Sequence, residues 1–231
     1  MKKALSFVLI MMLVISCTVI SGCSDKVEVN GFTLYKSDLV LLESFTDEDV
    51  RGATTEISVY AYPENDYNSG GIYIESGKNK YVFDWGVKGN DYPKVKICDF
   101  DGDGMNEIGA IFAYAQNVGD TFNYQEIHIL EKSGENGFDE QIYVADEYVG
   151  TIEENVDFSA NPDFNLATKI SYGEIVNFAF NDDGTITAST KYDNTFRDGE
   201  KTTQKTGEIT AVIKYSSRIF TAGEHKIVPD K

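Results

Sequence analysis

The feature that most constrains this sequence is the alternation of apolar and polar residues in short runs separated by Gly, Asn and Asp. A period of two is typical of β-strands with one buried face, whereas an amphipathic helix repeats every 3.6 residues. We expect strands at 56–62, 71–75, 80–85, 94–98, 107–114, 126–131, 174–180, 185–190 and 207–215. The pattern predicts a mostly β protein, formed as one antiparallel domain that is sandwich-like or partly propeller-like.

Turn signals separate several of these runs. Residues 181–184, with the sequence Asn-Asp-Asp-Gly, tolerate a left-handed backbone and predict a hairpin, and Asn30-Gly31 gives the same signal nearer the N-terminus. Helical periodicity is weak. Residues 37–50 are expected to form a short capped helix, and residues 138–155 fit either a strand or a helix.

The first 23 residues indicate export. Lys2 and Lys3 precede an apolar run over residues 4–19, which is the order of a secretory signal. The following run, Ile20-Ser21-Gly22-Cys23, resembles the lipobox of bacterial lipoproteins. The resemblance implies that residues 1–22 are a signal peptide, that the Cys23 thiol is joined to a diacylglyceryl group, and that residues 23–26 form a short tether.

Two alternatives to this interpretation remain open. A second lipobox-like run ends at Cys17, and an uncleaved apolar segment of this length is just long enough to act as a membrane anchor. With lipid at Cys23, several acyl chains on one residue would hold the protein stably on the extracytoplasmic face of the cell membrane. The formal net charge of −18 excludes nucleic acid as a partner, because the surface repels phosphates.

One acidic motif stands out, between the expected strands 94–98 and 107–114. Three aspartates at alternate positions and a glutamate four residues later give the order Asp-x-Asp-x-Asp-Gly-x-x-Glu. Calcium prefers six to eight oxygen ligands, and carboxylates two residues apart in a tight loop can turn toward one ion. The sequence therefore predicts a structural Ca²⁺ site whose ligands are Asp99, Asp101, Asp103, the backbone oxygen of Met105, and Glu107.

The motif resembles the short calcium loops of FG-GAP and VCBS-type β-repeats in secreted and cell-surface proteins. That resemblance implies a strand, a calcium loop and a second strand. This sequence contains one copy of the loop rather than several, and Glu107 stands at a position where these repeats more commonly have aspartate. An EF-hand would need an acid at Ala110 and helical flanks, and a haloacid-dehalogenase-like phosphatase would need Thr or Ser near Asp103, so the sequence disfavours both.

Other chemistry is poorly supported, and no catalytic residue is assigned. His128 and His225 are the only histidines, and Cys98 lies in an apolar run that predicts a buried, unreactive thiol. Tyr60 and Tyr62 share one face of an expected strand and Tyr73 lies on another, which offers a platform for stacking sugar rings. Strand-face packing is the favoured explanation of these tyrosines.

Residues 27–231 are thus expected to form a calcium-binding domain, with a weak candidate boundary at 153–162. The expected function is a non-catalytic binding or interaction module of the cell envelope, with a protein or glycan as its unidentified ligand. A glycan-directed envelope hydrolase with paired carboxylates is the alternative.

Overall fold

We describe a computed structural model of the chain, which places residues 26–29, 31–48, 54–64, 69–86, 92–115, 123–134 and 137–230. Cys23, Cys17 and the rest of the expected signal peptide lie outside these residues. The fold is mostly β, as predicted. Within the described ranges, no helix has the length and apolar character needed to cross a membrane.

Over the described residues the strands form four antiparallel sheets, each built from strands that follow one another along the chain. The first two sheets contain β1 (Lys26–Val29) with β2 (Phe32–Tyr35), and β3 (Val40–Glu48), β4 (Thr54–Tyr62), β5 (Gly71–Ser76) and β6 (Asn79–Asp84). The third contains β7 (Lys94–Cys98), β8 (Glu107–Ala115), β9 (Asn123–Ser133) and β10 (Gly137–Val144). The fourth contains β11 (Lys169–Phe180), β12 (Ile186–Asp198), β13 (Lys201–Ser216), β14 (Ile219–Ala222) and β15 (Lys226–Pro229).

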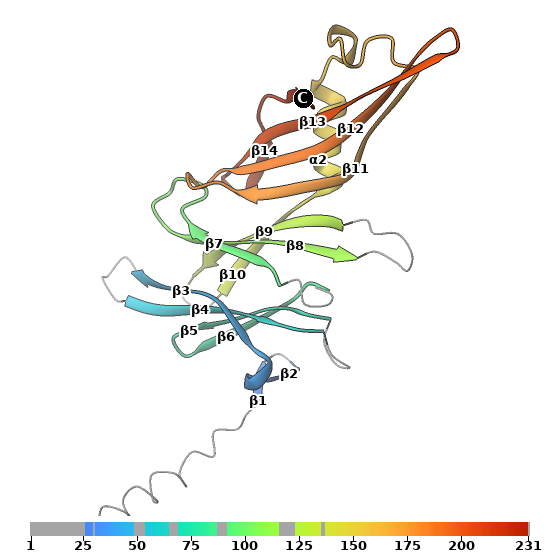
Figure 1. Ribbon diagram of the computed structural model, residues 1–231. Helices are drawn as coiled ribbons and strands as arrows, with labels where there is room; N and C mark the ends of the chain where they lie inside the picture. The colour runs from blue at the N-terminus through green and yellow to red at the C-terminus, as the bar shows by residue number, and fades with distance from the viewer. Residues whose placement is uncertain are drawn as a thin grey trace, which may run out of the picture.

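The three larger sheets are stacked in layers, with β7–β10 in the middle (Figure 1). Strand β9 shows why the middle sheet is covered on both faces. Ile127 and Ile129 belong to the core shared with β11–β15, whereas Leu130, on the opposite face, belongs to the core shared with β3–β6. Alternate side chains of one strand point to opposite faces, so this sheet needs a packed layer on each side.

The outer face of β3–β6 is covered by β1 and β2, whose antiparallel pairing confirms the hairpin predicted there, although Asn30 of the predicted turn lies outside the described residues. Val27, Val29 and Leu34 pack there against Tyr62 and Tyr73. Two short strands therefore complete the core at the N-terminal end of the stack.

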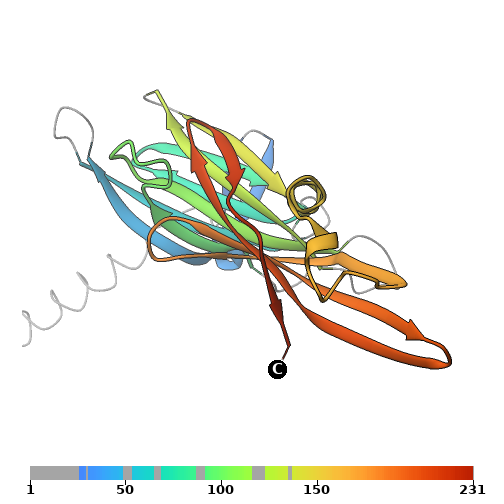
Figure 2. The same ribbon diagram turned by 90° about the horizontal axis from the view of Figure 1, so that it is seen from above.

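The last layer contains the only α-helix of the described residues, α2 (Ala145–Asn155). Its Tyr148 and Ile152 are fully buried, and the Tyr148 hydroxyl donates a hydrogen bond to the Ile209 carbonyl at 2.9 Å. The region predicted to be strand or helix thus contains both, β10 followed by α2. The weak boundary at 153–162 falls at the end of α2 and in the short 3-10 helix η2 (Phe158–Ala160). The long β12–β13 hairpin extends past the rest of its sheet (Figures 1 and 2).

The helix predicted for residues 37–50 is wrong. The structure has a 3-10 turn, η1 (Lys36–Asp38), and then strand β3. Leu42 and Phe45 both pack into the core between the first two layers, although they are three residues apart. A β-bulge between Leu41 and Glu43 shifts the register and produces this spacing, which imitates a helical period.

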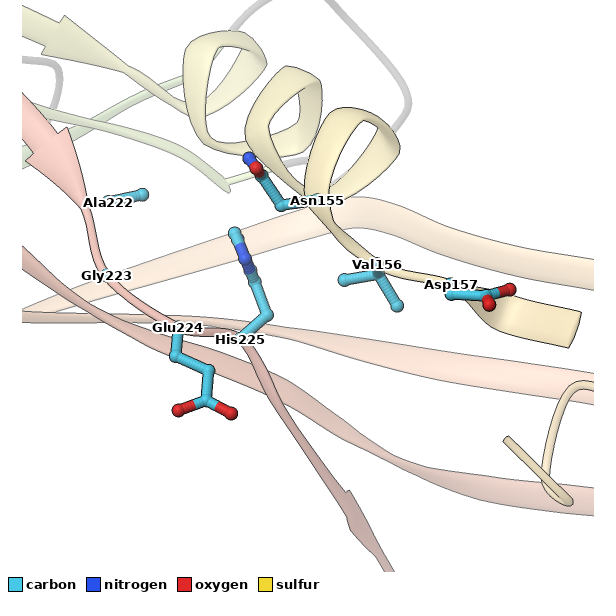
Figure 3. A pocket seen from close by; sticks show the side chains of 7 residues that line it. All are labelled: Asn155, Val156, Asp157, Ala222, Gly223, Glu224 and His225. Carbon is cyan, nitrogen blue, oxygen red and sulfur yellow. The ribbon is translucent and has the colours of Figure 1, made fainter. Parts of the chain in front are cut away.

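A surface pocket lies where the end of α2 meets the segment between β14 and β15 (Figure 3). The Thr151 hydroxyl donates to the Tyr148 carbonyl at 2.7 Å, so it accepts the hydrogen bond from His225 Nε2 at 3.1 Å. His225 Nδ1 is then a buried acceptor with no partner, and burial lowers the pKa of this histidine. His225 is therefore a neutral, packed side chain beside the pocket.

Candidate metal centre

The acidic motif forms the connection between β7 and β8, two paired strands of the middle sheet. β7 ends at Cys98 and β8 begins at Glu107, and these two residues are opposite each other in the antiparallel register. The strands predicted on either side of the motif are therefore confirmed. Both ends of the loop are fixed by the sheet, which holds a tight bend of charged residues at its edge.

The structure brings the four predicted carboxylates together. One oxygen from each of Asp99, Asp101, Asp103 and Glu107 can be chosen so that all four lie within 4.8 Å of one another. Asp103 is exposed, Asp99 and Asp101 are half-buried, and Glu107 is buried. The four side chains thus face a common centre at the protein surface, where a cation could be held by oxygen ligands.

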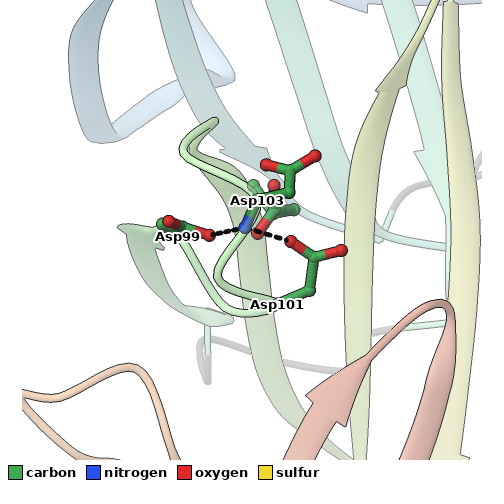
Figure 4. A group of neighbouring side chains, drawn as sticks. Asp99, Asp101 and Asp103 are labelled. Carbon is green, nitrogen blue, oxygen red and sulfur yellow. Dashed lines mark hydrogen bonds between the residues drawn. The ribbon is translucent and has the colours of Figure 1, made fainter.

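Backbone N–H groups organise the loop around Asp99. Its Oδ1 accepts hydrogen bonds from the N–H groups of Gly102 at 2.7 Å and Asp103 at 3.0 Å, and its Oδ2 accepts from Gly104 at 2.9 Å. Figure 4 shows the Asp103 N–H between the carboxylates of Asp99 and Asp101. Gly102 and Gly104 have φ angles of 80° and 92°, which non-glycine residues rarely adopt.

The other two aspartates are fixed in the same way, by short local turns. Asp101 Oδ1 accepts from the Asp103 N–H at 3.1 Å, and Asp103 Oδ1 accepts from the Met105 N–H at 2.8 Å. The Asx turns explain why aspartate occurs at alternate positions, since each side chain bonds the backbone two residues later. Met105 lies in this loop, and the ligation predicted for its backbone oxygen stays a prediction.

Glu107 closes the loop from the buried side. Its Oε2 accepts a hydrogen bond from the Phe100 N–H at 2.7 Å, and its side chain is only 4% exposed. Burial raises the pKa of this carboxyl to about 7; the Phe100 N–H opposes that change, and the negative charges of the three aspartates add to it. An unpaired carboxylate at this position is costly, because no basic side chain offsets its charge within the loop.

Phe100 anchors the loop in the core, a role that the sequence motif did not reveal. Its ring is 7% exposed and packs against Phe180 with centroids 5.4 Å apart. A Cβ atom at Gly109 would lie 2.5 Å from the Phe100 ring, so only glycine leaves room for it. The signal available in the sequence was one aromatic residue between two aspartates.

The loop also contacts the third layer. The hairpin turn between β11 and β12, predicted correctly at residues 181–184, places Gly184 against the entry to the loop. A Cβ at Gly184 would lie 3.1 Å from the Asp99 carbonyl oxygen. The candidate metal centre therefore lies where two layers of the fold meet.

The remaining predicted residues are placed as follows. Tyr73 is fully buried and Tyr62 is 2% exposed beneath β1–β2, and the Tyr60 and Tyr73 rings lie 5.8 Å apart. This arrangement favours core packing over an open sugar platform. Cys98 is half-buried, and burial raises the pKa of its thiol to about 11, outweighing the opposite effect of Lys96, so the thiol is protonated at neutral pH.

The pocket beside His225 includes two carboxylates, from Asp157 and Glu224. In Figure 3 these carboxylates point away from each other rather than toward one centre. Asp157 accepts hydrogen bonds from the N–H and hydroxyl of Ser159, which lower its pKa. The paired acids of a glycan hydrolase face one scissile bond from two sides, an arrangement that these diverging side chains do not form.

Comparison with known proteins adds no relative. No protein family, no curated protein and no solved structure matches this chain.

Proposed function

We propose that this chain is a lipoprotein of the bacterial cell envelope, anchored through lipid at Cys23, whose folded part is a calcium-stabilised binding or interaction module. The observation that supports calcium most directly is the convergence of Asp99, Asp101, Asp103 and Glu107 at the end of β7. The lipobox-like run before Cys23 supports the location. The ligand class, protein or glycan, follows from exposure on the cell surface.

Calcium fits this loop better than other metals because the ligands on offer are all oxygens. Zinc and copper prefer imidazole or thiolate, and magnesium needs near-ideal octahedral geometry with retained waters. Calcium accepts irregular sets of six to eight oxygens, which four carboxylates, one backbone oxygen and water would supply. The role of the ion is structural, since the loop links β7, β8 and the β11–β12 turn.

Calorimetric titration of the full chain tests the metal site. We expect one Ca²⁺ to bind, and Asp101→Asn to remove the binding, whereas the matched variant Asp193→Asn, an exposed acid on β12, keeps it. Extracellular calcium modules bind with Kd of about 10⁻⁴ to 10⁻³ M. Equal heats for wild type and Asp101→Asn would contradict the calcium proposal.

Fatty-acid labelling in a bacterial host tests the anchor separately. We expect label and membrane association to be lost in Cys23→Ala and retained in Cys17→Ala. If label and membrane association were lost in Cys17→Ala instead, the lipid would be assigned to Cys17. Label in neither wild type nor variant would reject the lipoprotein proposal without affecting the calcium result.

A further inference from the structure

A second group of charged side chains lies on the face of the middle sheet that packs against β3–β6, and the metal centre does not use it. His128 in β9 is 2% exposed. Glu126 lies two residues earlier on the same face of the strand, and Glu140 reaches the ring from β10. Trp85, which follows β6, comes from the neighbouring layer.

Both nitrogens of the His128 ring face a carboxylate. Nδ1 lies 2.6 Å from Glu140 Oε1, and Nε2 lies 3.2 Å from Glu126 Oε2. Glu140 Oε1 also accepts the indole N–H of Trp85 at 2.7 Å, which fixes this oxygen as an acceptor. Ionised carboxylates only accept, so both ring nitrogens are donors, and a ring with two N–H groups is an imidazolium cation.

Two aromatic rings contact the His128 ring. The Trp85 and His128 centroids are 4.5 Å apart, and Phe112 from β8 lies 4.8 Å from His128. Trp85 and Phe112 are themselves stacked, with an interplanar angle of 3°. Trp85 also remains attached to its own sheet, because its backbone N–H donates to the Gly70 carbonyl at 3.0 Å. Displacement of Trp85 would therefore report on the contact between the two layers.

The groups that face His128 are thus Glu126 from its own strand, Glu140 from β10, Phe112 from β8 and Trp85 from the first layer. Burial opposes the charge on His128, but the hydrogen bonds and negative charges of the two glutamates outweigh burial and raise its pKa. For Glu140 burial is likewise outweighed, by the hydrogen bond and charge of His128 and by the Trp85 N–H, and its pKa is lowered.

We propose that protonated His128 is a pH-sensitive latch that joins the β3–β6 layer to the middle sheet through Glu140 and Trp85. With the cation present, this group of side chains carries one net negative charge. When the cation loses its proton, two half-buried carboxylates remain beside a neutral ring, and a lone pair of the ring faces one of them. The resulting repulsion loosens the Glu140–Trp85 contact. The latch is independent of the calcium and lipid proposals.

The sign of the pH dependence follows from the raised pKa of His128. Its stabilising effect is complete below the pKa of about 6.5 of an unfolded histidine, and it is lost as the pH rises through the higher pKa of the folded state. The pKa of Glu140 sets the lower end of the pH range in which the His128–Glu140 contact is stabilising. The contact weakens as the pH falls through this lowered pKa, because Glu140 then gains a proton. His225 titrates on the other side of 6.5, since burial lowers its pKa.

The test uses the full chain, which has two histidines and one tryptophan, in saturating calcium to suppress titration of the acidic loop. Nitrogen NMR of the histidine rings should show two N–H groups on His128 at pH 6, with a titration midpoint above 6.5, and a midpoint below 6.5 for His225. Trp85 emission should change in one step at the His128 midpoint. The melting temperature should fall across the same interval.

Variants decide the assignment. His128→Gln should lose the fluorescence step, and His225→Gln and Asp101→Asn should keep it. If His128→Gln does not fold, Glu140→Gln serves instead, since it keeps an acceptor for Trp85 but should move the midpoint downward. A neutral His128 at pH 6, a step that persists in His128→Gln, or an unmoved midpoint in Glu140→Gln would each overturn the latch.

Discussion

Two groups of carboxylates on the same middle sheet solve the problem of buried negative charge in different ways. In the loop after β7, the four acids come from nine consecutive residues, and their hydrogen-bond donors are backbone N–H groups. Around His128, two acids from different strands share one cation that the protein itself supplies. The proposed calcium site would take its cation from solution, whereas the latch requires only a proton.

The comparison teaches that the source of the positive charge determines which solution condition controls each group. Calcium concentration should control the loop, and pH should control the latch. Both groups tie the middle sheet to a neighbour, the loop toward β11–β15 and the latch toward β3–β6. The predictions below test whether these two contacts respond independently.

The largest effect is expected for Phe100→Ala. The change removes a buried ring between two of the proposed calcium ligands, and large-to-small changes of buried aromatic residues cost about 3–5 kcal/mol. We expect a loss of about 3 kcal/mol in denaturant unfolding, together with weaker calcium binding, because the loop loses its anchor. Unchanged calcium affinity would show that the loop holds its shape without the core.

Glu140→Gln should destabilise the protein by about 1–2 kcal/mol at pH 6. Breaking a buried charge pair costs more, but Glu140 has a side-chain exposure of 28% and glutamine still accepts the Trp85 N–H. The loss should shrink at high pH, once the pH has passed the raised titration midpoint of His128. Glu126→Gln is the matched control and should cost less, since its oxygen lies 3.2 Å from the ring rather than 2.6 Å. Equal losses at both pH values would contradict the charge pair.

Calcium at about 1 mM should add about 0.4–1.4 kcal/mol to the free energy of unfolding, for Kd values of about 10⁻⁴ to 10⁻³ M. For a chain of this size the melting temperature should rise by about 1–5 °C relative to chelator. The rise should be absent in Asp101→Ala. Identical melting curves of wild type in calcium and chelator would remove the stabilising role.

The smallest effect is expected for Asp101→Asn without calcium. Burial and the neighbouring acids raise the pKa of Asp101, so its negative charge is unfavourable in the calcium-free fold. A neutral side chain at this position should leave the protein as stable in chelator or slightly more stable, while calcium binding is lost. Marked destabilisation in chelator would show that the charge itself holds the loop.

The sequence predicted the acidic loop well because all of its information is local. The alternation of Asp101 and Asp103 corresponds to two successive Asx turns, and Asp99 accepts hydrogen bonds from backbone N–H groups of the same loop. The flanking strands pair with each other across the loop. The anchor at Phe100 and the contact with Gly184 depend on the third layer, which no local pattern describes. The prediction of a helix over residues 37–50 failed for a related reason. The bulge in β3 changes the spacing of the buried residues, and the prediction relied on that spacing.

The latch could not be predicted in the same way. Glu126 and His128 are two residues apart, which places them on one face of a strand, but Glu140 joins them only through the β9–β10 register. Trp85 joins them only because two sheets stack. Contacts of this kind depend on how strands pair and sheets pack. A single sequence therefore shows the charged and aromatic residues but not that they meet.

The order of the layers has a consequence for biogenesis. Each sheet is built from one continuous stretch of the chain, and the layers follow one another from β1–β2 to β11–β15. A chain that is synthesised from its N-terminus can therefore complete one layer before the next is available. Contacts that are close in sequence form quickly, so such vectorial assembly would limit the time during which open sheet edges are free to aggregate.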